Sequence, residues 1–174
     1  RGVVHIGEVI EMISDAFEQI VDAGPLAREP CLKMKVMLVD TKLHEDAIHR
    51  GPAQVYPAVR DAIRLCMTDA KTVIYEPVQV LQIEAPIDYM GEISKLVQNK
   101  RGQLLDMQQE GPTVNVKAKM PVGEMFGLSS DLRSATEGRG VFFVVDQNFE
   151  RLPNELQEKI IRQIRTRKGL SENQ

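Results

Sequence analysis

Several features that would point to a specific function are scarce in this sequence or missing from it. Its 174 residues include only two cysteines, Cys31 and Cys66, which are too few for a disulfide framework and lack the spacing of metal ligands. We therefore expect a reducing, cytoplasmic compartment. No apolar run approaches the roughly 18 residues that a membrane-spanning helix requires, and no signal peptide opens the chain, so the sequence predicts no membrane partner.

The signatures of nucleotide binding and of covalent catalysis are also missing. The sequence has no Gly-x4-Gly-Lys-Ser/Thr phosphate loop, and in Asn99–Gly102 a glycine stands where the guanine-reading motif needs its carboxylate. Neither cysteine has a histidine and an acid at motif spacing, and no Gly-x-Ser-x-Gly elbow occurs. We therefore expect no nucleoside triphosphate, no metal and no catalytic residue in this chain.

An excess of positive charge is missing as well. Lys and Arg number 22 against 25 Asp and Glu, which gives a formal net charge of −3. Residues 1–70 hold 8 basic and 11 acidic side chains, residues 71–150 hold the same numbers, and residues 151–174 hold 6 and 3. Nonspecific nucleic-acid binding needs a dense cationic face, so an acidic body argues against it. Any contact with RNA must be local.

What the sequence does contain is a clear order of helices and strands. From Ile6 the apolar residues follow the three-and-four spacing of one helical face, and Gly24-Pro25 ends that helix. Over residues 32–38 apolar residues alternate with others, which predicts a strand. A polar loop covers residues 40–51, and Pro52 suits the first turn of the next helix. The predicted buried stripe of that helix is Val55, Val59, Ala62, Ile63 and Cys66.

Residues 71–150 show a second, self-contained pattern. Strands are predicted around residues 78–83, 103–107, 114–120 and 141–145, with one helix after Pro86 and another through residues 125–135. This order is βαββαβ, the ferredoxin-like pattern in which both helices cover one face of a four-stranded antiparallel sheet. Residues 151–174 are predicted to form a terminal helix and tail. The sequence therefore predicts an α+β chain.

Two segments leave other functions open. Arg139–Asp146 shares the Arg-Gly opening and the aromatic at Phe143 with the RNP1 motif, but lacks two of its aromatics and lies on the fourth strand. A free-standing ferredoxin-like RNA-binding module is thus an alternative, although strand aromatics such as Phe142 and Phe143 more often pack in a core. A small metal-dependent enzyme would need His44, Glu45 and His49, but the two histidines are five residues apart and no third ligand is evident.

At the polar loop the sequence resembles a known family. Asp40–Gln54, followed by Pro57–Arg60, resembles the tip of domain IV in the translocation GTPases, the family of elongation factor 2 and bacterial elongation factor G. The His49–Gly51 loop is similar to that of the archaeal and eukaryotic members and unlike the bacterial one, and Pro52-Ala53 is similar to the archaeal members. Further motifs resemble the family's ferredoxin-like domain V in register, so that the resemblance covers nearly the whole chain: Glu76-Pro77, Tyr89–Gly91, Lys100–Gly102, Pro121–Gly127 and Asp131–Ser134.

This resemblance implies a role in translation. The chain would be a carboxyl-terminal piece of a GTPase that moves transfer RNA and messenger RNA through the ribosome, and would not itself be a catalyst. Residues 1–70 would be the later part of domain IV, an α/β domain of ribosomal-protein type, and residues 71–150 would be domain V. GTP and magnesium would bind the parent protein in its GTPase domain, which is missing here together with the next two domains and the first strands of domain IV.

The resemblance also implies site residues. The family histidine that matches His49 is converted to diphthamide, the target of diphtheria toxin, and enters the decoding centre at the tip of domain IV. Arg50 would be a second contact to RNA, with Gly51-Pro52 shaping the loop. The remaining assignments are loop organisation or recognition by the diphthamide-synthesis enzymes for His44, Asp46 and Gln54, and contact with ribosomal RNA for Lys100 and Arg101.

Overall fold

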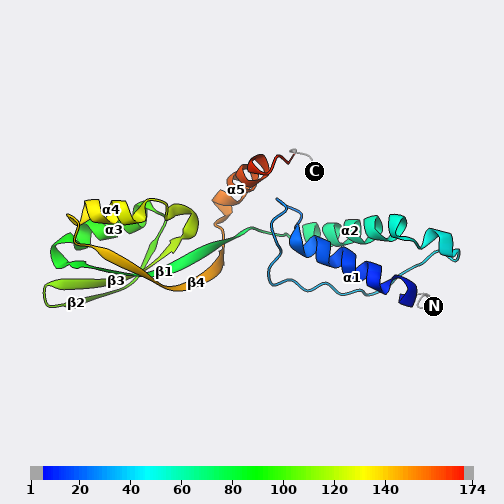
Figure 1. Cartoon of the computed structure of the whole chain (residues 1–174), viewed down its shortest axis with the longest axis horizontal. Helices are drawn as coiled ribbons and strands as arrows, with labels where there is room; N and C mark the ends of the chain where they lie inside the picture. The colour runs from blue at the N-terminus through cyan, green and yellow to red at the C-terminus, as the bar shows by residue number, and fades with distance from the viewer. Residues whose placement is uncertain (1–5, 171–174) are drawn as a thin grey trace. The chain divides into compact units, whose positions relative to one another are not determined.

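The computed structural model describes residues 6–170, and the chain divides into two compact units (Figure 1). Unit 1 spans Arg1–Ile74 and Pro153–Gln174, and unit 2 spans Tyr75–Leu152. None of the described helices is both long and apolar enough to cross a lipid bilayer. Unit 1 contains α1 (Ile6–Asp22), a short 3-10 helix (Ala47–His49), α2 (Pro52–Asp69) and α5 (Asn154–Arg167).

Helices α1 and α2 pack side by side in unit 1 (Figure 1). The predicted helices are confirmed, and α2 begins at Pro52 and continues through Pro57. Ala62 and Cys66 are exposed, so the buried stripe of α2 is narrower than the sequence predicted. The buried residues at this interface are Val9, Ala16 and Ile20 on α1, and Val55 and Ile63 on α2.

The strand predicted at residues 32–38 is wrong. This segment has no regular secondary structure, and the only sheet in the described part of the chain belongs to unit 2. Alternating apolar residues form a strand only where a neighbouring strand supplies hydrogen-bond partners. Without one, all apolar side chains of this segment except the half-buried Met34 are exposed, and Met37 and the adjoining Val39 are 68% and 89% exposed.

Unit 2 is a single antiparallel sheet with the strand order β2-β3-β1-β4. Helices α3 and α4 both lie against one face of this sheet (Figure 1). The arrangement is the predicted βαββαβ ferredoxin-like fold, and the α+β class is confirmed. Its elements are β1 (Tyr75–Pro86), α3 (Met90–Asn99), β2 (Gln103–Glu110), β3 (Thr113–Pro121), α4 (Leu128–Ala135) and β4 (Val141–Arg151).

The covered face of the sheet holds the core of unit 2. Leu81 and Ile83 on β1 are fully buried and pair with Ala118 and Val116 on β3. The expected core packing of Phe142 or Phe143 is confirmed for Phe142, while Phe143 is exposed because neighbouring strand residues point to opposite faces. The helices complete the core with Ile93, Val97, Leu128 and Leu132.

Gly102 allows α3 to turn directly into β2. Arg101 adopts a left-handed backbone with φ of +54°, and the Gly102 N–H then donates to the Val97 carbonyl at 2.8 Å, which closes the helix end. A Cβ atom on Gly102 would lie 2.7 Å from Val97 Cγ1, 2.8 Å from Val97 O and 3.0 Å from Lys119 O. Two of these three neighbours are backbone oxygens, which cannot move aside as a flexible side chain can.

Gly102→Ala is therefore expected to lower the free energy of unfolding by about 2 kcal/mol. Denaturant unfolding should show a lower midpoint with an unchanged slope. Gly123→Ala is the matched control, because a Cβ there would meet nothing within 4 Å. Equal midpoints for the two variants would contradict this account of Gly102.

Candidate functional site

The tip loop, Asp40–Gln54, leads into α2 and is ordered by its own polar groups. Asp46 caps the 3-10 helix, since its Oδ1 accepts a hydrogen bond from the Ile48 N–H at 3.1 Å. The Asp46 N–H donates to His44 Nδ1 at 3.0 Å. His44 and Asp46 thus fix the turn immediately before His49.

His49 ends the 3-10 helix with its side chain exposed. Its N–H donates to the Asp46 carbonyl at 3.2 Å, which fixes the backbone at this position. The imidazole rings of His49 and His44 meet edge to face, with centroids 4.5 Å apart and an interplanar angle of 69°. Within residues 6–170 no hydrogen bond or ion pair engages the His49 ring, so its nitrogens are accessible to a modifying enzyme or a ligand.

Arg50 anchors the tip loop to α1. The residue is only 8% exposed, and its Nη1 donates to the carbonyls of His44 at 2.8 Å and Glu45 at 2.7 Å. Its Nε and Nη2 lie 3.0 and 2.9 Å from the carboxylate of Glu8 on α1. Charge-assisted hydrogen bonds of this kind are about twice as strong as neutral ones. One buried guanidinium therefore holds both the turn and the helix beside it.

The exposed surface of the tip loop is acidic as a result. Glu8 compensates the charge of Arg50, so this cation is not presented to solvent. The other charged side chains of the loop are one base, Lys42, and three acids, Asp40, Glu45 and Asp46, all exposed. An anionic partner would be repelled by this tip unless a further cation were added to it.

Gly51 and Pro52 join the loop to α2. The Gly51 carbonyl accepts from the N–H groups of Gln54 at 3.1 Å and Val55 at 3.0 Å, and Pro52 occupies the first helical position, where no N–H is required. The Gln54 side chain folds over Gly51, with its Oε1 3.4 Å from where a Cβ would stand. The loop therefore runs from His49 into a helix without a flexible connection.

Lys100 and Arg101 lie in unit 2 and have internal partners. Lys100 Nζ lies 2.8 Å from an Asp131 carboxylate oxygen and donates to the carbonyls of Glu124 and Phe126, both at 3.2 Å. Arg101 makes a bidentate contact with Glu76, at 3.0 and 2.8 Å, and donates from Nε to Glu124 at 2.9 Å. The hydrogen bonds from Glu76 raise the pKa of Arg101 above its ordinary value, so it stays charged at any working pH.

Lys100 and Arg101 together hold the Pro121–Gly127 turn of unit 2. Lys100 binds the backbone carbonyls on both sides of Met125, and Arg101 binds the side-chain carboxylate of Glu124. Phe126 is 97% exposed on this fixed turn. The structure therefore gives both cations a structural use that the sequence did not reveal.

The partners of these cations could not be found by sequence reasoning. Glu8 is 42 residues from Arg50, and Glu76 and Glu124 are 25 and 23 residues from Arg101. No local motif links such positions, and the only available signal was an acid on the predicted face of a neighbouring element. Glu8, Glu76 and Glu124 are accordingly absent from the predicted site.

The described residues do not fit magnesium or GTP. No three His, Cys, Asp or Glu side chains within residues 6–170 are grouped so that they could hold a metal ion, and the sequence has no phosphate loop. No step that uses the nucleotide is therefore assigned to residues of this chain.

Comparisons with known proteins agree with this architecture. Residues 1–71 match elongation factor G domain IV, and residues 73–173 match the elongation factor G C-terminus. The chain is 56% identical over 170 residues to elongation factor 2 of Nanoarchaeum equitans, which covers 98% of this chain and 23% of that protein. It is 49% identical over 173 residues to elongation factor 2 of Pyrococcus horikoshii, a match that covers 99% of this chain and 24% of that protein. It is 50% identical over 169 residues to elongation factor 2 of Methanopyrus kandleri, a match that covers 97% of this chain and 13% of that protein.

The chain combines a unit that carries an ordered tip loop with a ferredoxin-like unit. This combination defines part of a translation elongation factor. The chain belongs to the elongation factor G and elongation factor 2 family, and the resemblance seen in the sequence is confirmed. It spans about a quarter of the length of the first two relatives and less of the third.

Proposed function

We propose that this chain supplies the tip and domain V of a cytoplasmic elongation factor that moves transfer RNA and messenger RNA through the ribosome, driven by GTP hydrolysis. His49 is the residue that enters the decoding centre, in the form of diphthamide. The observation that carries this proposal is an exposed imidazole on a short 3-10 turn that Asp46 caps and Arg50 ties to α1. A probe of RNA position must be held rigidly at its base and be open at its end, as His49 is.

The acidic surface of the tip explains why a modification is needed. Diphthamide adds a trimethylammonio cation and an amide to the imidazole, and so places a positive charge beyond Glu45 and Asp46. RNA phosphates are attracted to such a cation and repelled by the unmodified tip. The charge needed to touch RNA is thus supplied at one point rather than by a basic surface.

The other candidate residues take supporting roles in this proposal. The internal contacts of Arg50 make it a positioning residue for His49, while His44, Asp46, Gly51, Pro52 and Gln54 shape the surface that the diphthamide-synthesis enzymes recognise. Ribosomal RNA contact by Lys100 and Arg101 stays a prediction. GTP and magnesium would act in the GTPase and middle domains, and hydrolysis there would bias the position of the tip loop and domain V.

Peptide mapping of the full-length factor from its native host tests the modification. We expect the peptide that carries His49 to be heavier than the unmodified sequence, with fragmentation placing the added mass on the imidazole. An unmodified His49 in that material would overturn the diphthamide assignment.

His49→Ala in the full-length factor tests the role of the residue. We expect more frequent loss of the reading frame and slower translocation, because the cation at the tip is lost. Lys42→Gln is the matched control, since it removes an exposed cation of the same loop and leaves His49 in place. If His49→Ala matched the unaltered factor in both measurements, the proposed contact would be excluded.

A further inference from the structure

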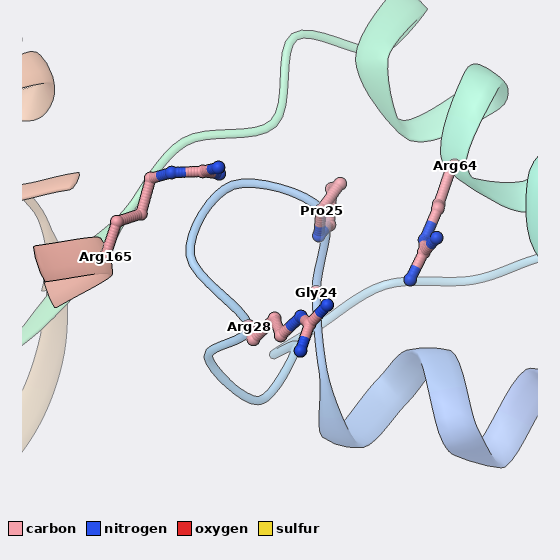
Figure 2. Close-up of a pocket in the computed structure, with 5 residues that line it drawn as sticks. All are labelled: Gly24, Pro25, Arg28, Arg64 and Arg165. Carbon is pink, nitrogen blue, oxygen red and sulfur yellow. The ribbon is translucent and has the colours of Figure 1, made fainter. Parts of the chain in front are cut away.

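Unit 1 contains a cationic cavity that is separate from the tip loop. The cavity measures about 350 Å³ and is lined by Gly24, Pro25, Arg28, Arg64 and Arg165. Its three arginines come from the loop after α1, from α2 and from α5, and Figure 2 shows their side chains extending toward the space around Gly24 and Pro25. Segments far apart in the sequence thus bring three guanidinium groups to one place.

The loop that lines this cavity is tightly held. The Gly24 N–H donates to the Glu29 carbonyl at 2.9 Å, and the Arg28 N–H donates to the Gly24 carbonyl at 3.1 Å. A Cβ on Gly24 would lie 2.9 Å from the Glu29 carbonyl oxygen, so a larger residue there would force the backbone at Glu29 to shift. Arg28 has a left-handed φ of +50°, a backbone state that a non-glycine residue adopts only at some energetic cost.

Helix α5 completes the same wall. Arg165 Nη1 donates to the Leu26 carbonyl at 2.9 Å, and Lys168 Nζ donates to the carbonyl of Arg28 at 2.6 Å. Lys168 also pairs with the Glu29 carboxylate at 2.6 Å. These contacts use the carbonyl groups of the loop and its nearest acid, and they leave the cavity with a positive lining.

Two of the three arginines have no counter-charge among the described residues. Neither the Arg28 nor the Arg64 side chain makes a hydrogen bond or an ion pair with any residue in the range 6–170. Arg60 lies one turn before Arg64 on α2, and its buried Nε also has no hydrogen-bond partner among the described residues. Like charges gathered around one cavity repel each other, and an anion between them would remove that cost.

We propose that this cavity binds a backbone phosphate of RNA. Guanidinium groups match phosphate oxygens with paired hydrogen bonds, and the cavity has room for a phosphodiester. The choice of RNA as the source of the phosphate rests on the proposed function, whereas anion binding itself follows from the geometry alone. The tip loop with diphthamide at His49 is one local contact to RNA in this acidic chain. The cavity gives unit 1 a second contact, which does not use His49.

Binding of a fluorescent 20-nucleotide RNA hairpin to the 174-residue chain tests the proposal, with Arg28→Gln/Arg64→Gln as the test variant. Arg133→Gln/Arg162→Gln is the control, because it removes the same net charge from exposed sites elsewhere. We expect the test variant to bind at least about 10-fold more weakly at 100 mM salt. The slope of log K against log[salt] should fall by about 0.8, as the loss of one phosphate contact requires. The control should bind as the unaltered chain does.

Equal loss of affinity in the two double variants would overturn the proposal, since it would indicate nonspecific attraction. A parallel titration with inorganic phosphate, followed by NMR of the arginine Nε–H signals, separates the anion from its source. Shifts at Arg28 and Arg64 together with hairpin binding support the proposal, whereas phosphate binding without hairpin binding overturns RNA as the partner. If neither phosphate nor the hairpin binds, the proposed anion site is overturned. The assay contains no ribosome and no diphthamide, so its result is independent of the role of His49.

Discussion

Replacing Arg50 by methionine is expected to lower the free energy of unfolding of unit 1 by about 3 kcal/mol and to loosen the tip loop. The substitution keeps much of the apolar volume and removes the hydrogen bonds to the His44 and Glu45 carbonyls, each worth about 1.5 kcal/mol or more when the donor is charged. The contact with Glu8 adds little, because that carboxylate is half exposed and can return to water. The loop therefore loses most of what orders its own turn, together with its ion pair to α1.

Hydrogen exchange measured by mass spectrometry checks this result peptide by peptide. A loss of about 3 kcal/mol corresponds to roughly a 100-fold increase in local opening, which should appear in residues 44–51 and at the start of α1. Peptides of unit 2 should be unchanged. Lys42→Met is the matched control, since Lys42 is an exposed cation of the same loop. If exchange in the tip loop were the same in both variants, Arg50 would not be its anchor.

Arg101→Met carries the second large expected effect, a loss of about 2.5 kcal/mol in unit 2. Glu76 is only 18% exposed at its side chain and would keep its charge without its bidentate partner. Removing one member of a buried ion pair costs about 3–5 kcal/mol, and the partial exposure of Arg101 reduces that figure. The Pro121–Gly127 turn would also lose the contact through Glu124.

Denaturant unfolding with a probe in unit 2 measures this loss, and Lys95→Met provides the comparison. Lys95 pairs with Glu92 on the exposed surface of α3 at 2.9 Å, and its removal should cost at most about 0.5 kcal/mol. A second variant, Glu76→Gln/Arg101→Met, removes both charges and should recover part of the lost stability. Arg101→Met with the stability of Lys95→Met would show that the ion pair has no structural role.

The fold of unit 2 was predictable because every element has a local signal. The alternation of β3 matches its burial, with Val114, Val116, Ala118 and Met120 all facing the core. Glycines and prolines mark the turns between the strands. Residues 32–38 show the limit of the same reasoning, because their alternation is as clear, but pairing depends on a second strand that a local pattern cannot supply.

The position of the candidate site in the sequence was predictable. Which of its charged side chains are buried and which face solvent was not. The resemblance located the tip loop and His49, and the structure shows an exposed imidazole there. Arg50 lies beside it in the sequence, but its side chain is buried against Glu8 of α1. Which cation faces solvent depends on helix packing, and this information is spread over the whole of unit 1. The arginines of the cavity were missed for the same reason.

The register of β1 and β4 has a consequence for the modular structure of the chain. Tyr75 and Arg151, the first residue of β1 and the last of β4, are paired across the sheet, so the two ends of unit 2 are only about 5 Å apart. Unit 2 is thus an insertion within unit 1, entered after Ile74 and left before Pro153. A linker of about two residues could join those positions, so that unit 2 can be removed as a cassette, expressed alone, or closed into a ring without breaking a strand.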